Sequence, residues 1–263
     1  MSYRTIISLM PKPFSIDPDA QAFLTAASIT NATISGAINT LVVQMKTDNI
    51  WSKMKAIYPM VGGTASTHKF NLKDPRDLDA AFRLQFNGGV THDANGITSN
   101  GVNGYANTFL NDSTHLGNTN KSVSMYIRNI LTVGSPMGVV NSGGTAFNRF
   151  YPEFANVDYS TLGTSQVGRA KAGTQKGFFT MSKSASGSFK YYRPGTAIIT
   201  STAANQANVN GTYYLLASNN TVGAEYSVAN LAFASIQESL NDTEEANFRA
   251  AVIAFETTLS RNV

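Results

Sequence analysis

The feature that most constrains the fold is a change of residue pattern after about Phe82. From there on, short segments rich in β-branched and aromatic residues alternate with clusters of Gly, Asn and Ser. Such segments are typical of β-strands, and the clusters between them are typical of tight turns. Many short strands at this spacing predict an antiparallel β-sandwich of the jelly-roll type, in a mainly β chain. The expected strands are Phe82–Phe86, Gly104–Leu110, Ser122–Ile130, Gly138–Asn141, Ala146–Phe150, Gly177–Ser182, Ser188–Arg193, Gly211–Ser218 and Glu225–Ile236.

Helical signals precede this region. Asp17 followed by Pro18 is an N-cap with proline at the first helical position, which predicts the start of a helix. Asn31 can cap a second helix, because apolar residues recur at helical spacing after it. These residues are Ile34, Ile38, Leu41, Val42 and Met45.

A third, short helix is expected over Ile50–Ile57, and Pro59 would end it. The Gly, Thr and Ser-rich residues 62–75 are typical of a connector. We therefore expect a helical N-terminal segment with its connector over residues 1–75, and the sandwich over residues 76–263.

A last helix is expected at the C-terminus. Asp242 with Glu245 three residues later resembles a capping box. An apolar face follows at helical spacing, which would pack against the sandwich. It consists of Phe248, Val252, Phe255 and Leu259.

Composition excludes several classes of protein. Charged residues make up only 14%, so Ser, Thr, Asn and Gly must supply much of the polar surface. The chain has no cysteine, which rules out disulfides, thiol nucleophiles and cysteine-ligated metals. Its net charge of +4 comes from scattered Lys and Arg, so we expect no nucleic-acid partner. Pro11 and Pro13 interrupt the N-terminal apolar patch, and no run reaches the roughly 18 apolar residues of a membrane span, so we expect neither classical secretion nor membrane insertion.

Residues that could support catalysis or metal binding lack the spacing that such sites need. His68, His92 and His115 match no zinc motif. Glu153 and Asp158 are five residues apart, which puts them on opposite faces of a strand and not in a glycosidase-like pair.

Two further features have ordinary explanations. Glu225 has no acidic residue near it in the sequence with which it could form a catalytic pair. Asp93, Asn95 and Asn100 could offer oxygen atoms to calcium, but without a closing acid they are typical of turns. We expect a protein that is not an enzyme and that has no cofactor and no metal.

Aromatic residues on strands are the better indication of binding. Phe189 and Tyr191 share one strand face and Lys190 and Tyr192 the other, while Tyr213 and Tyr214 repeat the double tyrosine. Tyrosine beside Asn and Asp could hold a sugar ring, so Tyr192 and Tyr214 are possible glycan contacts. The alternative is that one tyrosine of each pair belongs to the core and the other is a half-buried cross-strand partner.

Two stretches resemble known families. Tyr226–Ile236 followed by Leu240–Phe248 resembles the closing strand and helix of laminin-G and concanavalin A-like jelly rolls. Residues 50–77, with the preceding helix and Asn-Gly-Tyr-Ala-Asn-Thr-Phe-Leu at 103–110, are similar to virion proteins of tailed bacteriophages. This resemblance covers most of the chain and implies a structural component of the phage particle with a lectin-like fold.

The expected function is therefore a non-enzymatic capsid-surface or tail subunit located in the virion. It would act by contacts with other virion proteins and as a homo-oligomer. The apolar helix faces would either cover the sandwich or dock on a partner. The alternative function is a lectin-like module that binds a host-surface glycan.

Overall fold

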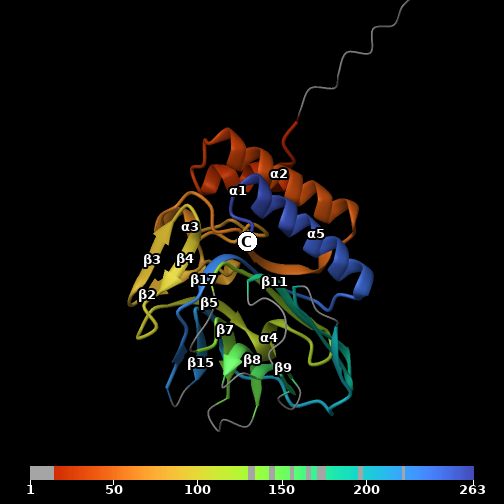
Figure 1. Cartoon of the computed structure of the whole chain (residues 1–263). Coiled ribbons are helices and arrows are strands. Elements are labelled where there is room, and N and C mark those ends of the chain that lie inside the picture. The colour runs from red at the N-terminus through yellow and green to blue at the C-terminus, as the bar shows by residue number, and fades with distance from the viewer. Residues whose placement is uncertain are drawn as a thin grey trace, which may run out of the picture.

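Two stacked β-sheets and a layer of helices make up the part of the chain that this computed structural model describes (Figure 1). The described residues are 15–129, 134–141, 146–154, 157–163, 167–170, 176–194, 198–220 and 223–263. The expected mainly β sandwich, with helices at the N-terminal side and a C-terminal helix, is confirmed.

The first sheet has eight strands in the order β13-β12-β11-β6-β17-β4-β3, and β1 also pairs with β17. Antiparallel pairing links each of these neighbours. Its strands are β1 (Met54–Tyr58), β3 (Val90–Asp93), β4 (Gly96–Ser99), β6 (Lys121–Ile127), β11 (Gly177–Ala185), β12 (Ser188–Tyr192), β13 (Ile199–Ser201) and β17 (Asn230–Gln237).

The second sheet has nine strands in the order β10-β9-β8-β7-β14-β5-β2, with β15 beside β7 and β16 beside β15. The β15–β7 pair is parallel, whereas the other pairs are antiparallel. Its strands are β2 (Gln85–Asn87), β5 (Tyr105–Asn111), β7 (Met137–Val140), β8 (Phe147–Phe154), β9 (Val157–Leu162), β10 (Val167–Ala170), β14 (Thr212–Leu215), β15 (Ala217–Asn220) and β16 (Glu225–Tyr226).

Three long helices lie over the first sheet: α1 (Pro18–Ala26), α2 (Ala32–Thr47) and α5 (Asp242–Thr258) (Figure 1). The caps expected for α1 and α2 are confirmed, because Asp17 accepts from the backbone N–H of Asp19 and Asn31 accepts from that of Ile34. The cap of α5 lies one residue earlier than expected: Asn241 and Glu244 form the capping box. The short helices are α3 (Ala65–His68) and α4 (Asp112–His115).

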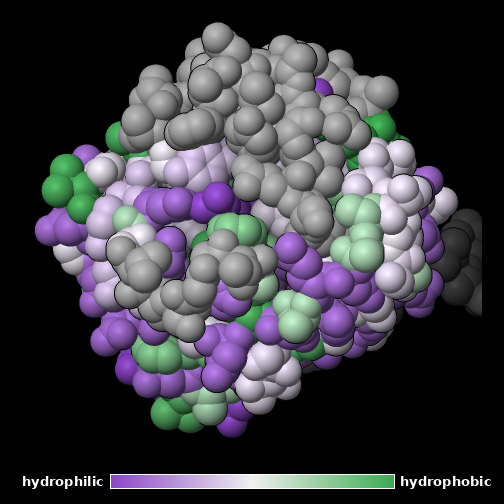
Figure 2. All heavy atoms as spheres, turned by 90° about the horizontal axis from the view of Figure 1, so that it is seen from below, coloured by the Kyte–Doolittle hydropathy of each residue, from purple (hydrophilic) through white to green (hydrophobic). Residues whose placement is uncertain are grey.

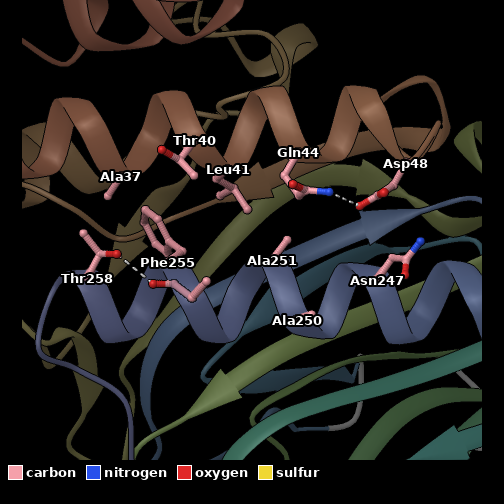
Figure 3. Close-up of a pocket in the computed structure, with 11 residues that line it drawn as sticks. Ala37, Thr40, Leu41, Gln44, Asp48, Asn247, Ala250, Ala251, Phe255 and Thr258 are labelled. Carbon is pink, nitrogen blue, oxygen red and sulfur yellow. Dashed lines mark hydrogen bonds between the residues drawn. The ribbon is translucent and has the colours of Figure 1, made fainter.

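The helices α2 and α5 lie side by side, and alanines together with larger apolar residues line their contact. Ala37 and Leu41 of α2 face Ala251 and Phe255 of α5 (Figure 3). A groove of about 260 Å³ remains between the two helices.

The prediction of a helix over Ile50–Ile57 is wrong. The chain forms one 3₁₀ turn at Trp51–Lys53 and then the strand β1, which pairs with β17 from Met54↔Gln237 to Tyr58↔Ala234. The apolar residues of this segment are buried on both faces of a sheet, and such a run has no period that separates strand from helix. As a result, a strand of the first sheet lies within residues 1–75.

Register explains where the two apolar cores sit. Phe178, Tyr126 and Phe233 are cross-strand partners on β11, β6 and β17, and all three point to the helices. The next row, Phe179, Met125 and Ala234, points to the second sheet. Because successive side chains alternate between faces, the central strands β6 and β17 of the first sheet are buried on both sides.

Within the described residues, no helix has the length and apolar composition that crossing a membrane requires.

Candidate functional site

In the described part of the chain, the outward face of the second sheet carries half-buried side chains, and no described helix lies over it. In β5 the inward residues are buried and the outward ones, beginning with Tyr105, are half-buried. The same alternation places Tyr213 in the core and Tyr214 on the outward face of β14. Figure 2 views the molecule from the end opposite the helices and shows hydrophilic and hydrophobic side chains interleaved there.

Three tyrosines gather on this face. The rings of Tyr105 and Tyr214 stack, with centroids 4.4 Å apart and planes at 20°. Tyr226 of β16 lies next to them, with its ring centroid 6.3 Å from that of Tyr105. Burial, together with the neighbouring hydroxyl of Tyr105, raises the pKa of Tyr214, so its hydroxyl stays protonated near neutral pH.

An ion pair lies on the same face. Arg149 of β8 donates from Nη1 to both carboxylate oxygens of Glu225 on β16, at 2.7 and 2.8 Å. The guanidinium carbon lies 4.6 Å from the ring centre of Phe147 and 5.1 Å from that of Tyr151. These aromatic rings and the carboxylate hold the arginine in one orientation.

Gly138 gives the arginine its path across the sheet. Gly138 of β7 is the cross-strand partner of Arg149 on one side and of Tyr214 and Ser218 on the other. A Cβ at position 138 would lie 2.7 Å from the Cβ of Arg149. The absence of a side chain therefore lets Arg149 lie across β7 toward Glu225, in the same row as Tyr214.

We call Tyr105, Tyr214, Tyr226, Arg149 and Glu225, with the flanking Phe147 and Tyr151, the tyrosine–arginine face. It combines flat apolar rings with hydrogen-bond donors and acceptors at fixed positions. Such a surface can bind a ligand that has both an apolar face and several polar groups.

Of the two tyrosines expected to contact a glycan, the structure places only Tyr214 on this face. Tyr192 lies in the first sheet, is 4% exposed, and donates its hydroxyl to Asp242 at 2.6 Å. Burial and this carboxylate raise the pKa of Tyr192. Because its ring is packed beneath the start of α5, Tyr192 has little surface to offer a ligand.

The other residues singled out from the sequence are dispersed. His68 and His92 meet at 3.1 Å, whereas His115 accepts from the backbone N–H of Asn111. Glu153 lies in β8 and Asp158 in β9, but their side chains are outside the described part of the chain.

The residues weighed as calcium ligands make local turn contacts. Asp93 accepts from the backbone N–H of Asn95, and Asn100 accepts from those of Val102 and Asn103. Among the described residues, no three His, Asp or Glu side chains gather as metal ligands would.

A buried polar cluster between the sheets is structural in character. Asp112 accepts from Lys121 at 2.9 Å, Asn148 at 2.7 Å and Tyr213 at 3.0 Å. Asp112 and Lys121 are both fully buried. The lone pairs of this carboxylate are engaged by several protein donors, so the cluster ties the two sheets together and offers no free catalytic group.

Sequence reasoning missed Arg149, Glu225 and Tyr105 as members of one site. Glu225 appeared isolated because its partner is 76 residues away in the sequence. An outward Arg between Phe147 and Tyr151 at period-two spacing was the signal that could have found it.

Comparisons with known proteins agree on the fold. No protein-family model and no curated protein matches the chain. Among solved structures, a Trypanosoma rangeli sialidase in complex with 2,3-difluoro-KDN is 10% identical, with a TM-score of 0.54, over 85% of this chain and 40% of that chain. The same sialidase in complex with sialic acid is 12% identical, with a TM-score of 0.51, over 81% and 38%.

Domain 4 of AbnA, an extracellular arabinanase from Geobacillus stearothermophilus, in complex with arabinotriose, is 14% identical, with a TM-score of 0.49, over 75% of this chain and 98% of that domain. This chain spans about two fifths of the sialidase chains that it matches. With its two stacked sheets and closing helix, the described chain is a concanavalin A-like β-sandwich with a helical layer over one sheet.

Proposed function

We propose that the chain binds glycans through the tyrosine–arginine face and catalyses no reaction. The observation that carries this proposal is the stacked pair of Tyr105 and Tyr214 beside the oriented Arg149–Glu225 pair. A sugar ring has an apolar C–H face and a rim of hydroxyls. The tyrosine rings would take the apolar face, while Arg149 and Glu225 would exchange hydrogen bonds with the hydroxyls.

The fold supports this proposal in a coarser way. The sialidase, of which 38% matches this chain in fold, was solved in complex with sialic acid. At 12% identity that likeness concerns the fold, so the ligand of this chain is argued from its own residues.

The pairing of Glu225, the acidic residue of this face, favours binding without catalysis. Both carboxylate oxygens of Glu225 are engaged by Arg149, whereas the two-carboxylate mechanism of most glycosidases needs two carboxyl groups free to act on the bond. Depolymerisation of a polysaccharide that is abolished by Glu153→Gln would contradict this part of the proposal.

The direct test is a glycan array with the wild-type chain, followed by titration calorimetry on any hit. For Tyr214→Ala we expect a roughly fivefold weaker Kd, because an aromatic contact contributes about 1 kcal/mol. The matched control is Trp51→Ala, which removes a half-buried aromatic ring in the chain segment before β1 and should leave Kd unchanged. An array with no saturable signal for the wild type would sink the proposal.

The role as a virion subunit, in contact with other virion proteins and as a homo-oligomer, stays a separate proposal that rests on the sequence resemblance. The structure bears on one detail of it. Phe23, Leu24, Ile38 and Leu41 are buried in the core between the helices and the first sheet, so these apolar faces cover the sandwich. Mass spectrometry of purified particles tests this role, and absence of the chain from them would remove it.

A further inference from the structure

Two histidines that are far apart in the sequence meet beside the helical layer. His68 ends α3 and is 1% exposed, and His92 lies in the edge strand β3. Their Nδ1 atoms are 3.1 Å apart, which is hydrogen-bond distance. The other ring nitrogen of His68, Nε2, accepts from the backbone N–H of Gly63 at 3.2 Å.

These two contacts allow one arrangement of protons. Because Nε2 of His68 accepts, the proton of its neutral ring is on Nδ1. Nδ1 of His68 therefore donates to Nδ1 of His92, and His92 carries its own proton on Nε2. A metal ion between the two Nδ1 atoms would require both of them deprotonated, and a ligating histidine normally donates from its other nitrogen. The acceptor role of His68 Nε2 thus favours a hydrogen bond over a metal site.

Adding a proton disrupts this arrangement at either ring. A proton on Nδ1 of His92 would face the N–H of His68, and a proton on Nε2 of His68 would face the N–H of Gly63. The neighbouring charges do not compensate. Arg261 is paired with Glu256 and donates to the carbonyl oxygen of Met60, and Asp93 accepts from the N–H of Asn95.

The histidine pair supports one wall of a pocket of about 540 Å³. Gly62, Gly63 and Thr67 form that wall, and the first turn of α2 and the chain after α5 form the others. Gly62 and Gly63 have φ of +90° and +74°, so the wall follows a backbone path that depends on glycine. The hydrogen bond from Gly63 to His68 fastens this path to α3.

We propose that His68 and His92 form a pH-sensitive latch, which holds the Gly62–Gly63 wall closed at neutral pH and releases it when the pair takes up a proton. The latch is independent of glycan binding, because it lies beside the helical layer and not on the tyrosine–arginine face.

The acid–base properties of the pair agree with this geometry. Burial, with smaller contributions from His92 and Arg261, lowers the pKa of His68 to about 3, and burial also lowers the pKa of His92. An opened histidine returns toward its ordinary pKa of about 6.5. Opening is therefore coupled to proton uptake below about pH 6.5.

Nuclear magnetic resonance tests the latch in the full chain. Two-bond proton–nitrogen correlations at about pH 7.5 should show His68 protonated on Nδ1 and His92 on Nε2. Hydrogen exchange should show the opening constant at the Gly63 amide rise roughly thirtyfold from about pH 7.5 to 5.0, for one coupled proton. The opposite tautomers, or a Gly63 protection factor that does not change with pH, would overturn the proposal.

Variants separate the latch from general acid sensitivity. In His68→Gln the amide oxygen replaces Nε2 as acceptor and does not titrate, so Gly63 should stay protected at both pH values. In His68→Ala the Gly63 amide should be unprotected at both. The matched control is His115→Gln, at an exposed histidine, which should keep the wild-type response. A wild-type pH response that persists in His68→Gln would also overturn the latch.

Discussion

The two sheets of this sandwich are built from similar strands but differ in what covers them. In the first sheet, β6 is buried at all seven positions, because helices lie over one face and the second sheet over the other. In the second sheet, β5 alternates between half-buried and buried residues along its whole length. The central strand β6 of the first sheet therefore uses the side chains on both of its faces for packing, whereas β5 of the second sheet keeps half-buried side chains on one face.

Polar residues show the same difference. Ser122 and Ser124 on β6 are fully buried, and both accept from the side-chain amide of Gln237. On the second sheet, Arg149 and Glu225 pair on the outward face and stay partly exposed. Ser122, Ser124 and Gln237 thus satisfy one another in the interior, whereas Arg149 and Glu225 keep partial contact with solvent.

The largest expected effect is on the helix-covered side. Phe233 is fully buried, and its ring packs near those of Phe178, Phe248 and Phe255. Phe233→Ala should lower the free energy of unfolding by about 4 kcal/mol, because it opens a cavity in that core. Phe147→Ala on the outward face of the second sheet should cost about 1 kcal/mol, since its ring is half-buried. Urea denaturation measures both free energies. Equal losses of stability in the two variants would contradict the proposed difference in burial between the two sheets.

The next largest effect is expected at Gly138, whose missing side chain leaves room for Arg149. Gly138→Ala should lower the free energy of unfolding by about 2 kcal/mol and weaken glycan binding, because the new methyl group displaces Arg149 from Glu225. The matched control is Gly36→Ala in α2, where an added Cβ meets nothing within 4 Å. That change should stabilise the chain by about 1 kcal/mol through helix propensity. A Gly138→Ala variant as stable as the wild type would show that the crossing is not tight.

Acid should act on the helix-covered side through His68. Its pKa in the folded chain is lowered to about 3, so the stability it contributes is present above the unfolded value of 6.5 and is lost as pH falls. The expected slope is about 1.4 kcal/mol per pH unit between about pH 6 and 5. Glu256 acts in the opposite direction, because burial raises its pKa.

Urea denaturation at several pH values, with wild type and His68→Gln, isolates the histidine contribution, since Glu256 is common to both chains. Burial raises the pKa values of Asp17 and Glu238, but contacts with Lys46 and Lys55 outweigh it and lower them. These carboxylates therefore lose their contribution to stability only below about pH 4. Parallel curves for the two chains between pH 6 and 5 would contradict the prediction.

The smallest effect is expected at an exposed ion pair of the first sheet. Lys55 contacts Glu238 at 3.0 Å, and both side chains are more than a third exposed, at 35% and 37%. Lys55→Ala should change the free energy of unfolding by less than about 1 kcal/mol, and less still at high salt, because solvent screens the pair. A loss as large as that of Phe233→Ala would mean that burial does not set the ranking.

Local signals account for the parts of the fold that the sequence predicts well. The starts of α1 and α2 follow from Asp17 and Asn31, because a cap is an interaction between neighbours in the chain. At α5 the same reasoning finds the helix but shifts the cap from Asn241 to Asp242, since both residues can cap. Boundaries of strands are less well predicted: the single strand expected over Gly211–Ser218 is two strands, β14 and β15, separated at Leu216, which has a φ of +66°.

Long-range pairing accounts for what sequence reasoning missed. The strands β3, β4 and β13 are short, and β3 and β13 lie at the two edges of the first sheet. The sequence of β1 does not distinguish a strand from a helix, and only its pairing with β17 makes it a strand. The candidate site was predicted in part, since Tyr214 is on the outward face but Tyr192 is beneath α5. The double tyrosines look alike in sequence, and only the cover over each sheet separates them.

The sequence by itself determined that the chain is a mainly β sandwich with capped helices at its ends, because turn residues, alternation and caps act over a few residues. Only the tertiary structure decided which sheet face the helices cover, and so which tyrosine reaches solvent. It also brought Arg149 to Glu225 and His68 to His92. The physical reason is that these contacts depend on strand register and layer stacking, which join residues that no local interaction relates.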